Sequence, residues 1–159
     1  TLNCRHVYVP PFQPPDKERK YGNLTLTYAT QIHACVVEID EETGEVEIVD
    51  YAAVDDCGVR INPQIVEGQV HGATAHALDM PDIKTAYIES PSPFNELGTK
   101  GMGEGGGAAI HAICAAIQDA LRSAGLPAVV YDSHNPPERV WRMIKNPEES
   151  RSLVEVIEA

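Results

Sequence analysis

A single carboxylate stands among glycines in residues 98–107, GTKGMGEGGG, immediately before a segment with helical periodicity. Glycine-rich loops at helix N-termini offer backbone N–H groups and a partial positive charge, which suit an anionic ligand. Glu104 is flanked by Gly103 and Gly105, so no adjacent side chain blocks access to its carboxylate. This arrangement suits a general base beside a bulky anionic cofactor. The spacing is equally compatible with a Glu104 that only complements the helix dipole.

The spacing of other reactive residues argues against several kinds of site. The loop lacks the Gly-Lys-Ser/Thr ending of a P-loop, and the prolines ahead of it, Pro91 and Pro93, argue against a dinucleotide fingerprint. The four cysteines form no CxxC pair, so we expect no zinc or iron–sulfur site and predict the reduced thiols typical of the cytoplasm. His71 and His76 lie about 140° apart on a helix, so we predict no metal site there. His111 is predicted to be a core or interface histidine.

The overall composition limits the class of partner. The chain has 159 residues, with 12 Lys and Arg against 24 Asp and Glu, which gives a formal net charge of −12. A field of this sign repels phosphate backbones and anionic lipid headgroups, so nucleic acid and membrane surfaces are not expected as partners. The sequence contains no apolar run long enough to span a bilayer.

The pattern of apolar and turn residues predicts an α+β fold with a β-hairpin, short strands and three helices. We expect an extended Pro-rich arm over 1–22 and a hairpin whose strands flank a turn at 41–44. Asn62 and Pro63 are typical of an N-cap followed by the first residue of a helix, here ending near Ala77. Gly68 and Gly72 in this helix suggest tight packing. The remaining predicted elements are a strand over 84–89, a helix over 108–123, a strand over 128–131 and a final helix that starts at residues 136–137.

Two sequence blocks, in this order, carry a specific resemblance. The first runs VDDCG (54–58), INP (61–63), VEGQ (66–69) and HG (71–72), and the second is KGMGEGG (100–106). Together they closely resemble the C-terminal part of the molybdenum-binding subunit of the xanthine dehydrogenase, aldehyde oxidase and aerobic carbon monoxide dehydrogenase family. The resemblance implies that residues 23–159 form the C-terminal portion of a molybdopterin-binding domain, and therefore one part of a composite active site.

The resemblance also implies a cofactor, a reaction and partners. The cofactor would be molybdenum held by a molybdopterin, with the cytosine dinucleotide form expected from bacterial members. The reaction would oxidise a small-molecule carbon with water-derived oxygen, Glu104 acting as the base toward a metal-bound hydroxyl. Electrons would pass to [2Fe-2S] and FAD subunits, alongside the rest of the molybdenum-binding chain. Two alternatives stay open: a non-catalytic assembly module of the same fold, and a free-standing domain that binds an anionic nucleotide.

Further site residues follow from the same resemblance. Gln69 falls at the position whose amide hydrogen-bonds the pterin; the alternative is a solvent-facing helix glutamine. Lys100, Gly101 and Gly103 would contact the cofactor through the ammonium and the backbone, or else form an ordinary loop. Asp55, Asp56 and Asn62 are predicted to cap and order the turn before the Gln69 helix.

The sequence departs from the family pattern in two places. Family members carry a further stretch of strand and loop where Leu78 here passes directly to Asp79. Many relatives also have bulkier residues or proline where this chain has residues 105–108, GGGA. The second departure falls beside Glu104, so the resemblance implies no particular pocket shape or substrate.

Overall fold

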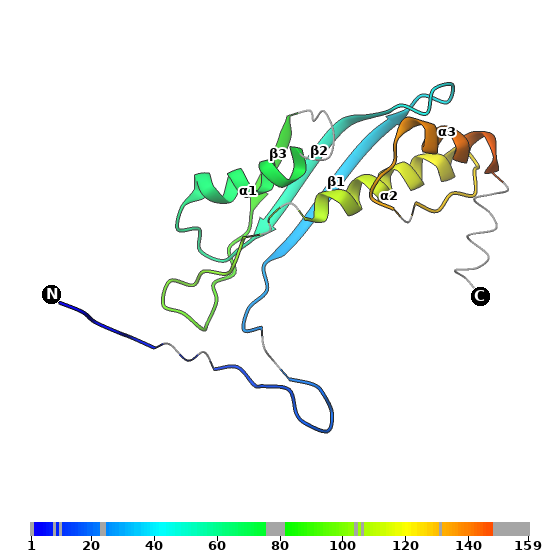
Figure 1. Ribbon diagram of the computed structural model, residues 1–159. Coiled ribbons are helices and arrows are strands. Elements are labelled where there is room, and N and C mark those ends of the chain that lie inside the picture. Colours follow the sequence, from blue (N-terminus) through cyan, green and yellow to red (C-terminus); the bar gives the residue numbers. More distant parts are fainter. Residues whose placement is uncertain are drawn as a thin grey trace.

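The computed structural model describes residues 2–7, 9, 11–22, 25–75, 82–103, 105, 107–130 and 132–147. Three strands and three helices make up the body of the chain, which confirms the predicted α+β class (Figure 1). In chain order they are β1 (Thr30–Ile39), β2 (Val46–Asp56), α1 (Pro63–Ala75), β3 (Ile83–Tyr87), α2 (Ala108–Ser123) and α3 (Pro137–Lys145).

The strands form one mixed sheet in the order β1-β2-β3. Strands β1 and β2 are the predicted antiparallel hairpin, with a register shift between Val36 and Val37. At the hairpin turn, Asp40 accepts hydrogen bonds from the backbone N–H groups of Glu42 and Thr43, at 2.7 and 3.0 Å. Gly44 closes this turn with a φ of 76°. Strand β3 pairs parallel with β2, as a crossover through α1 requires.

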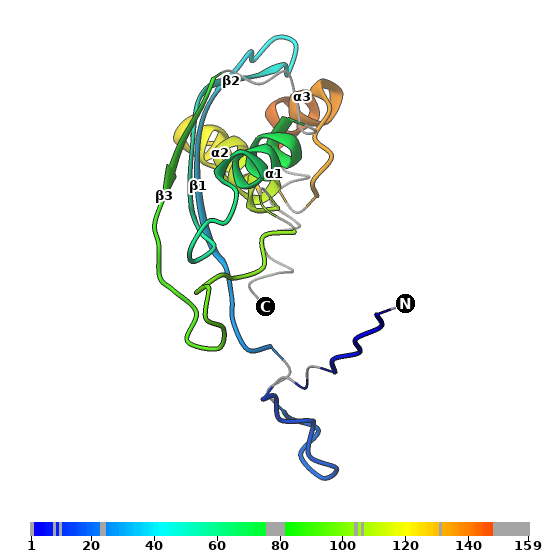
Figure 2. The same ribbon diagram turned by 90° about the vertical axis from the view of Figure 1, so that its left-hand side faces the viewer.

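All three helices lie on one face of the sheet (Figure 2). Helix α2 packs along β1 with Ala109, Ile113, Ile117 and Leu121 buried, as the spacing of its apolar residues predicts. The core between the sheet and the helices is a single cluster of buried residues. Its members are Ile48, Tyr51, Ala53, Val70, Ala109, Ile113, Ile117, Leu121, Ala128 and Val140.

The predicted strand over 128–131 is wrong for the residues that the structure describes, because 126–130 adopt no strand. Side chains of α2 satisfy the backbone there instead. The amide oxygen of Gln118 accepts from the N–H of Val130 at 3.1 Å, and Nε of Arg122 donates to the carbonyl of Ala128 at 3.1 Å. These two polar groups therefore need no neighbouring strand.

The described residues ahead of β1 form no helix and no strand of the sheet, and they extend away from the body of the chain (Figure 1). The division into a Pro-rich arm over 1–22 and a molybdopterin-binding portion over 23–159 stays a prediction. No helix in the described ranges is long and apolar enough to cross a membrane.

Candidate functional site

Two segments far apart in the sequence, 55–60 and 98–101, are joined by backbone hydrogen bonds. The N–H of Val59 donates to the carbonyl of Gly98 at 3.1 Å, and the N–H of Lys100 donates to the carbonyl of Cys57 at 2.8 Å. Gly58 has a φ of 67°, and a Cβ there would lie 2.2 Å from the carbonyl oxygen of Gly98. Only glycine accommodates both the positive φ and this close approach. The turn after β2 therefore fixes where the glycine loop begins.

A nearly buried ion pair reinforces this junction. Nζ of Lys100 lies 3.2 Å from Oδ2 of Asp56 and 2.6 Å from Oγ of Ser90, and the Lys and Asp side chains are 12% and 15% exposed. Asp56 also accepts from the N–H groups of Gly58 and Ser90, at 2.9 and 3.1 Å, and from the Ser90 hydroxyl. Burial alone would raise the pKa of Asp56, but these hydrogen bonds outweigh burial and hold that pKa well below its usual range. Asp56 orders the turn, as predicted, and it holds the Lys100 ammonium.

Helix α1 contacts the glycine loop through Gln69. Nε2 of Gln69 donates to the carbonyl of Gly103 at 2.9 Å, and the Gln69 residue is half-buried. The start of α1 is fixed by Asn62, whose Oδ1 accepts from the N–H groups of Gln64 and Ile65 at 3.1 and 3.3 Å. This confirms the predicted N-cap. The cap sets the register of α1 and thereby brings Gln69 to the loop.

The end of the loop lies close to β1. A Cβ at Gly105 would lie 2.7 Å from Cε of Met102, 3.3 Å from Cβ of Gln69 and 3.4 Å from Nε2 of Gln31. Nε2 of Gln31 also lies 3.9 Å from Sδ of Met102. Gly105 is buried and its N–H donates to the carbonyl of Met102 at 3.2 Å. Gly105 therefore lies between Met102, α1 and the first strand of the hairpin.

Comparison with known proteins identifies the fold. A family model described as the molybdopterin cofactor-binding domain matches residues 1–80, half of the chain, including both hairpin strands and α1. The chain belongs to this family. The glycine loop lies outside the matched residues, so its assignment depends on individual relatives.

The relatives of this family member are large subunits of molybdenum enzymes. The chain is 30% identical to the carbon monoxide dehydrogenase large chain of Hydrogenophaga pseudoflava, over 91% of this chain and 20% of that protein. It is 34% identical to the nicotine 6-hydroxylase large subunit of Paenarthrobacter nicotinovorans, over 71% and 17% respectively. The structure of quinoline 2-oxidoreductase from Pseudomonas putida 86 superposes with a TM-score of 0.69 and 36% identity, covering 79% of this chain and 20% of that one. These matches confirm the resemblance to large subunits of the xanthine and carbon monoxide dehydrogenase family.

The chain spans about a fifth of the length of these relatives. The alignment with the Hydrogenophaga protein runs over 175 positions, more than the 159 residues of this chain, so the relative carries inserted residues. This agrees with the prediction that family members have an additional stretch. Its predicted place, between Leu78 and Asp79, lies outside the described residues.

The described part of the loop fits a molybdopterin. A Cβ at Gly101 or Gly103 would meet no described atom within 4 Å, so there is space beside the backbone at both positions. Among the described residues, no group accepts a hydrogen bond from the N–H groups of Gly101, Met102 or Gly103, and none donates to Oε1 of Gln69. The loop thus offers three backbone donors and one amide acceptor, which suits the mixed polar edge of a pterin.

The remaining predicted site residues behave differently. The Lys100 ammonium is engaged by Asp56 and Ser90 rather than free at the loop. Glu104 lies outside the described residues, between Gly103 and Gly105, and so does His76. His111 is exposed on α2, which makes the prediction of a core position wrong. Gly68 and Gly72 have no described atom within 4 Å of an added Cβ, so the suggested tight packing is absent from the described part of the chain.

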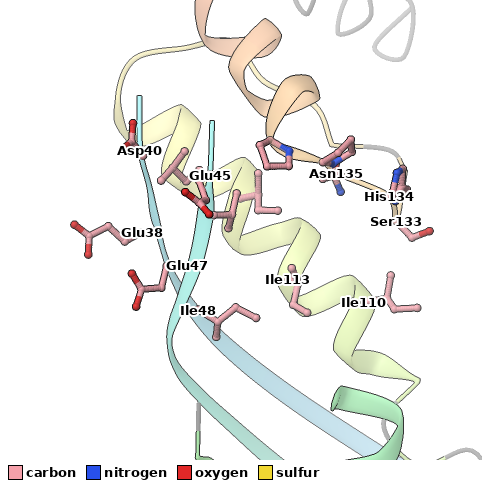
Figure 3. Close-up of a pocket in the computed structure, with 15 residues that line it drawn as sticks. Glu38, Asp40, Glu45, Glu47, Ile48, Ile110, Ile113, Ser133, His134 and Asn135 are labelled. Carbon is pink, nitrogen blue, oxygen red and sulfur yellow. The ribbon is translucent and has the colours of Figure 1, made fainter. Parts of the chain in front are cut away.

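A cavity of about 1050 Å³ lies at the other end of the hairpin, between the β1–β2 turn, α2 and the start of α3. Ile48 and Ile113 face each other across it, and His134 and Asn135 lie beyond the helix (Figure 3). Of the predicted site residues that the structure describes, Gln69, Lys100, Gly101 and Gly103, none lines this cavity. Among the described residues there is also no cluster of three or more His, Cys, Asp or Glu side chains that could hold a metal.

Proposed function

We propose that the chain contributes the general base and part of the pterin site to the large subunit of a molybdenum hydroxylase. The observation that carries this proposal is the hydrogen bond from Gln69 to the carbonyl of Gly103, at 2.9 Å. It brings the two sequence blocks of the family resemblance together at the residue that precedes Glu104. The relatives, which are large subunits of molybdenum enzymes, support the same reading.

The molybdenum-pterin group, when bound, supplies the redox centre that accepts electrons from the substrate carbon. Oε1 of Gln69 would accept a hydrogen bond from a pterin N–H, and the backbone N–H groups of residues 101–103 would donate to its carbonyl or anionic groups. The N-terminus of α2, which has no acidic residue in its first turn, adds a favourable field for an anion. The Glu104 carboxylate takes up the proton that is released when water-derived oxygen is transferred to the substrate.

The proposal includes the parts that this chain does not contain. Because the chain spans about a fifth of its relatives, the rest of the molybdenum-binding subunit must complete the pocket. Electrons leave through [2Fe-2S] and FAD subunits in a cytoplasmic complex, and the pterin is of the cytosine dinucleotide form. The substrate is a small molecule with an oxidisable carbon.

The experiment is substitution of Glu104 in the assembled enzyme, with metal and pterin content measured on the same samples. Removal of a general base lowers the rate by about 100- to 10,000-fold, so Glu104→Gln should lose that much turnover and keep its molybdenum. Activity within tenfold of the parent would refute the assignment. A purified complex without stoichiometric molybdenum and pterin would instead support the non-catalytic assembly module.

The role of Gln69 is tested with a matched helix residue. Gln69→Leu removes both the bond to Gly103 and the amide acceptor, and should reduce molybdenum and pterin content. Gln64→Leu, at an exposed position of the same helix, is the control for helix propensity and should leave cofactor content unchanged. Equal cofactor content in the two variants would remove Gln69 from the pterin site.

A further inference from the structure

The sheet has a second face, opposite the three helices, that the described residues leave largely exposed (Figure 2). Side chains alternate between the two faces along each strand, so the residues between the core positions point to this second face. The larger side chains there are far from buried, because Ile32 is 64% exposed and Val36 is 56% exposed. We call this surface the open face. Its apolar members are Ile32, Ala34 and Val36 of β1, Ala52 and Val54 of β2, and Ala86 of β3.

The strand register joins these residues into one apolar surface. Ile32 stands opposite Val54, which in turn stands opposite Ala86, and Ala34 stands opposite Ala52. Side chains at directly opposed positions contact each other across the strands. The apolar residues of the open face are therefore contiguous rather than scattered singly.

The composition of β1 differs from that of a strand with one face in water. An antiparallel pair of that kind carries polar residues on its solvent face. On β1 the outward positions from residue 32 to residue 36 are all apolar, whereas the inward residues Gln31 and His33 are polar. A contiguous apolar surface of this kind marks a contact with another element, so we infer that the open face is covered in the assembled protein.

The end of the open face beside the β1–β2 turn is acidic. Glu38 and Glu47 are both exposed, and they stand directly opposite each other in the register. Like charges at opposed positions destabilise a strand pair. Neither carboxylate belongs to an ion pair within the described part of the chain, and Lys84 is engaged by Asp50 at 2.6 Å. This end of the face therefore suits an occupant that brings a Lys or Arg side chain.

Charge and chain length distinguish a second copy of this chain from a different partner. A second copy would bring the same opposed carboxylates to the contact, on a chain whose formal net charge is −12. The chain spans about a fifth of the length of its relatives, so most of a large subunit is available to cover the face. An element of the same subunit is also held at a high effective concentration beside the face. Both arguments favour the remaining large subunit.

We propose that an apolar element of the remaining large subunit packs on the open face, with a Lys or Arg side chain over Glu38 and Glu47. The small residues Ala34, Ala52 and Ala86 let bulky side chains of that element approach the sheet closely, as the density of a protein interior requires. The identity of this occupant rests on the proposed function, whereas the covering of the face does not.

The test measures thiol labelling of the assembled enzyme, read peptide by peptide with mass spectrometry. Ala34→Cys and Ala86→Cys place small thiols on the open face, and Glu42→Cys places one at the exposed hairpin turn as the control. A thiol reacts only where the reagent reaches it, so labelling in both face variants should be at least about tenfold slower than in the control. Less protection than this in either variant would overturn the proposal. Should one face variant fail to assemble, the other decides.

A second substitution tests the cation over the acidic end. Glu47→Gln, added to Ala34→Cys, removes one charge of the opposed pair. If a Lys or Arg lies over the pair, labelling should become about two- to fivefold faster, because an ion pair is lost. If none does, relief of the repulsion leaves labelling unchanged or slower, and that result would refute the predicted cation. Glu41→Gln, in the hairpin turn, is the matched control and should leave the labelling rate unchanged.

Dilution identifies the occupant, and neither readout depends on turnover. Protection that persists at concentrations where copies of the enzyme are separate supports the remaining large subunit. Protection that disappears there identifies a second copy and overturns the proposed occupant. A complex that protects both face positions but lacks molybdenum would sink only the proposed function. An enzyme that loses turnover in Glu104→Gln but labels freely at the open face would sink only this inference.

Discussion

The ion pair between Lys100 and Asp56 decides whether this lysine serves the fold or the cofactor. Replacing Lys100 with Met leaves a carboxylate that is 15% exposed without its only cation among the described residues. Breaking a fully buried pair costs about 3–5 kcal/mol. Both side chains keep some contact with water, and Asp56 keeps its hydrogen bonds to Gly58 and Ser90. We therefore expect the free energy of local opening to fall by about 2 kcal/mol, which is about a 30-fold change in the opening equilibrium.

The assay is hydrogen exchange of the assembled protein, read by mass spectrometry over 55–60 and 98–101. These are the segments whose backbone bonds the ion pair reinforces. Exchange there should accelerate about 30-fold in Lys100→Met, and more in Asp56→Asn, because that variant also weakens two bonds to backbone N–H groups. The double variant should be less destabilised than the sum of the single variants, by about 1–2 kcal/mol.

Cofactor content of the same variants distinguishes the two roles of Lys100. If its ammonium acts only on Asp56, the double variant should lose less molybdenum than the two single losses combined predict. If the ammonium also contacts the cofactor directly, the two losses should combine in full, and that result would refute the reasoning from the ion pair. The pH dependence adds a check. The depressed pKa of Asp56 means that its stabilising contribution is present above its unfolded value of 3.8 and is lost as pH falls below it.

Five further substitutions test the packing that positions the site and the space beside the loop. Gly44→Ala should lower the thermal midpoint strongly, because φ is 76° and the added Cβ would lie 2.2 Å from a carbonyl oxygen of α3. Gln118→Leu should cost about 1–3 kcal/mol by leaving a loop N–H unpaired, measured as faster exchange over 126–130. Gly105→Ala should reduce cofactor content, because the added Cβ would lie 2.7 Å from Cε of Met102. Adding Met102→Ala to that variant should restore part of the cofactor content. Gly101→Ala tests steric access for the cofactor without disturbing the fold, because no described atom lies within 4 Å of the added Cβ.

Local patterns predicted most elements because each has its own signal in the sequence. The Asn62–Pro63 start of α1 is a local property of the backbone, and the prediction agrees with the structure. The strand expected at 128–131 failed because its apolar residues pack under α2, whose Gln118 and Arg122 satisfy the backbone. Apolar character predicted burial there correctly, but it could not distinguish a strand from a buried loop.

The site could be predicted only in part, because its key contacts join distant segments. Nothing in the local sequence shows that the Lys100 ammonium meets Asp56, 44 positions away. The burial of Asp55 had a visible signal: Tyr51, Ala53 and Asp55 alternate on β2, and the first two belong to the core face. That alternation places Asp55 in the core as well. The turn residues that follow, Asp56, Cys57 and Gly58, led instead to the prediction that Asp55 orders the turn, and this prediction is wrong because Asp55 is buried on β2.

The charge of the chain now bears on how an anionic cofactor is held. The formal net charge is −12, and both cations of the joined segments 55–60 and 98–101 are engaged, Lys100 with Asp56 at 3.2 Å and Arg60 with Glu89 at 3.5 Å. Arg60 also lies over the ring of Tyr87, 4.4 Å from its centroid. Under the proposed function, the described part of the loop would offer the cofactor backbone N–H groups, one amide and a helix N-terminus, and these recognise shape and polarity more than they neutralise charge. If the rest of the large subunit supplies the basic groups that balance the phosphates, this chain alone should bind the cofactor much more weakly than the complete subunit does, which a binding measurement on the two proteins would check.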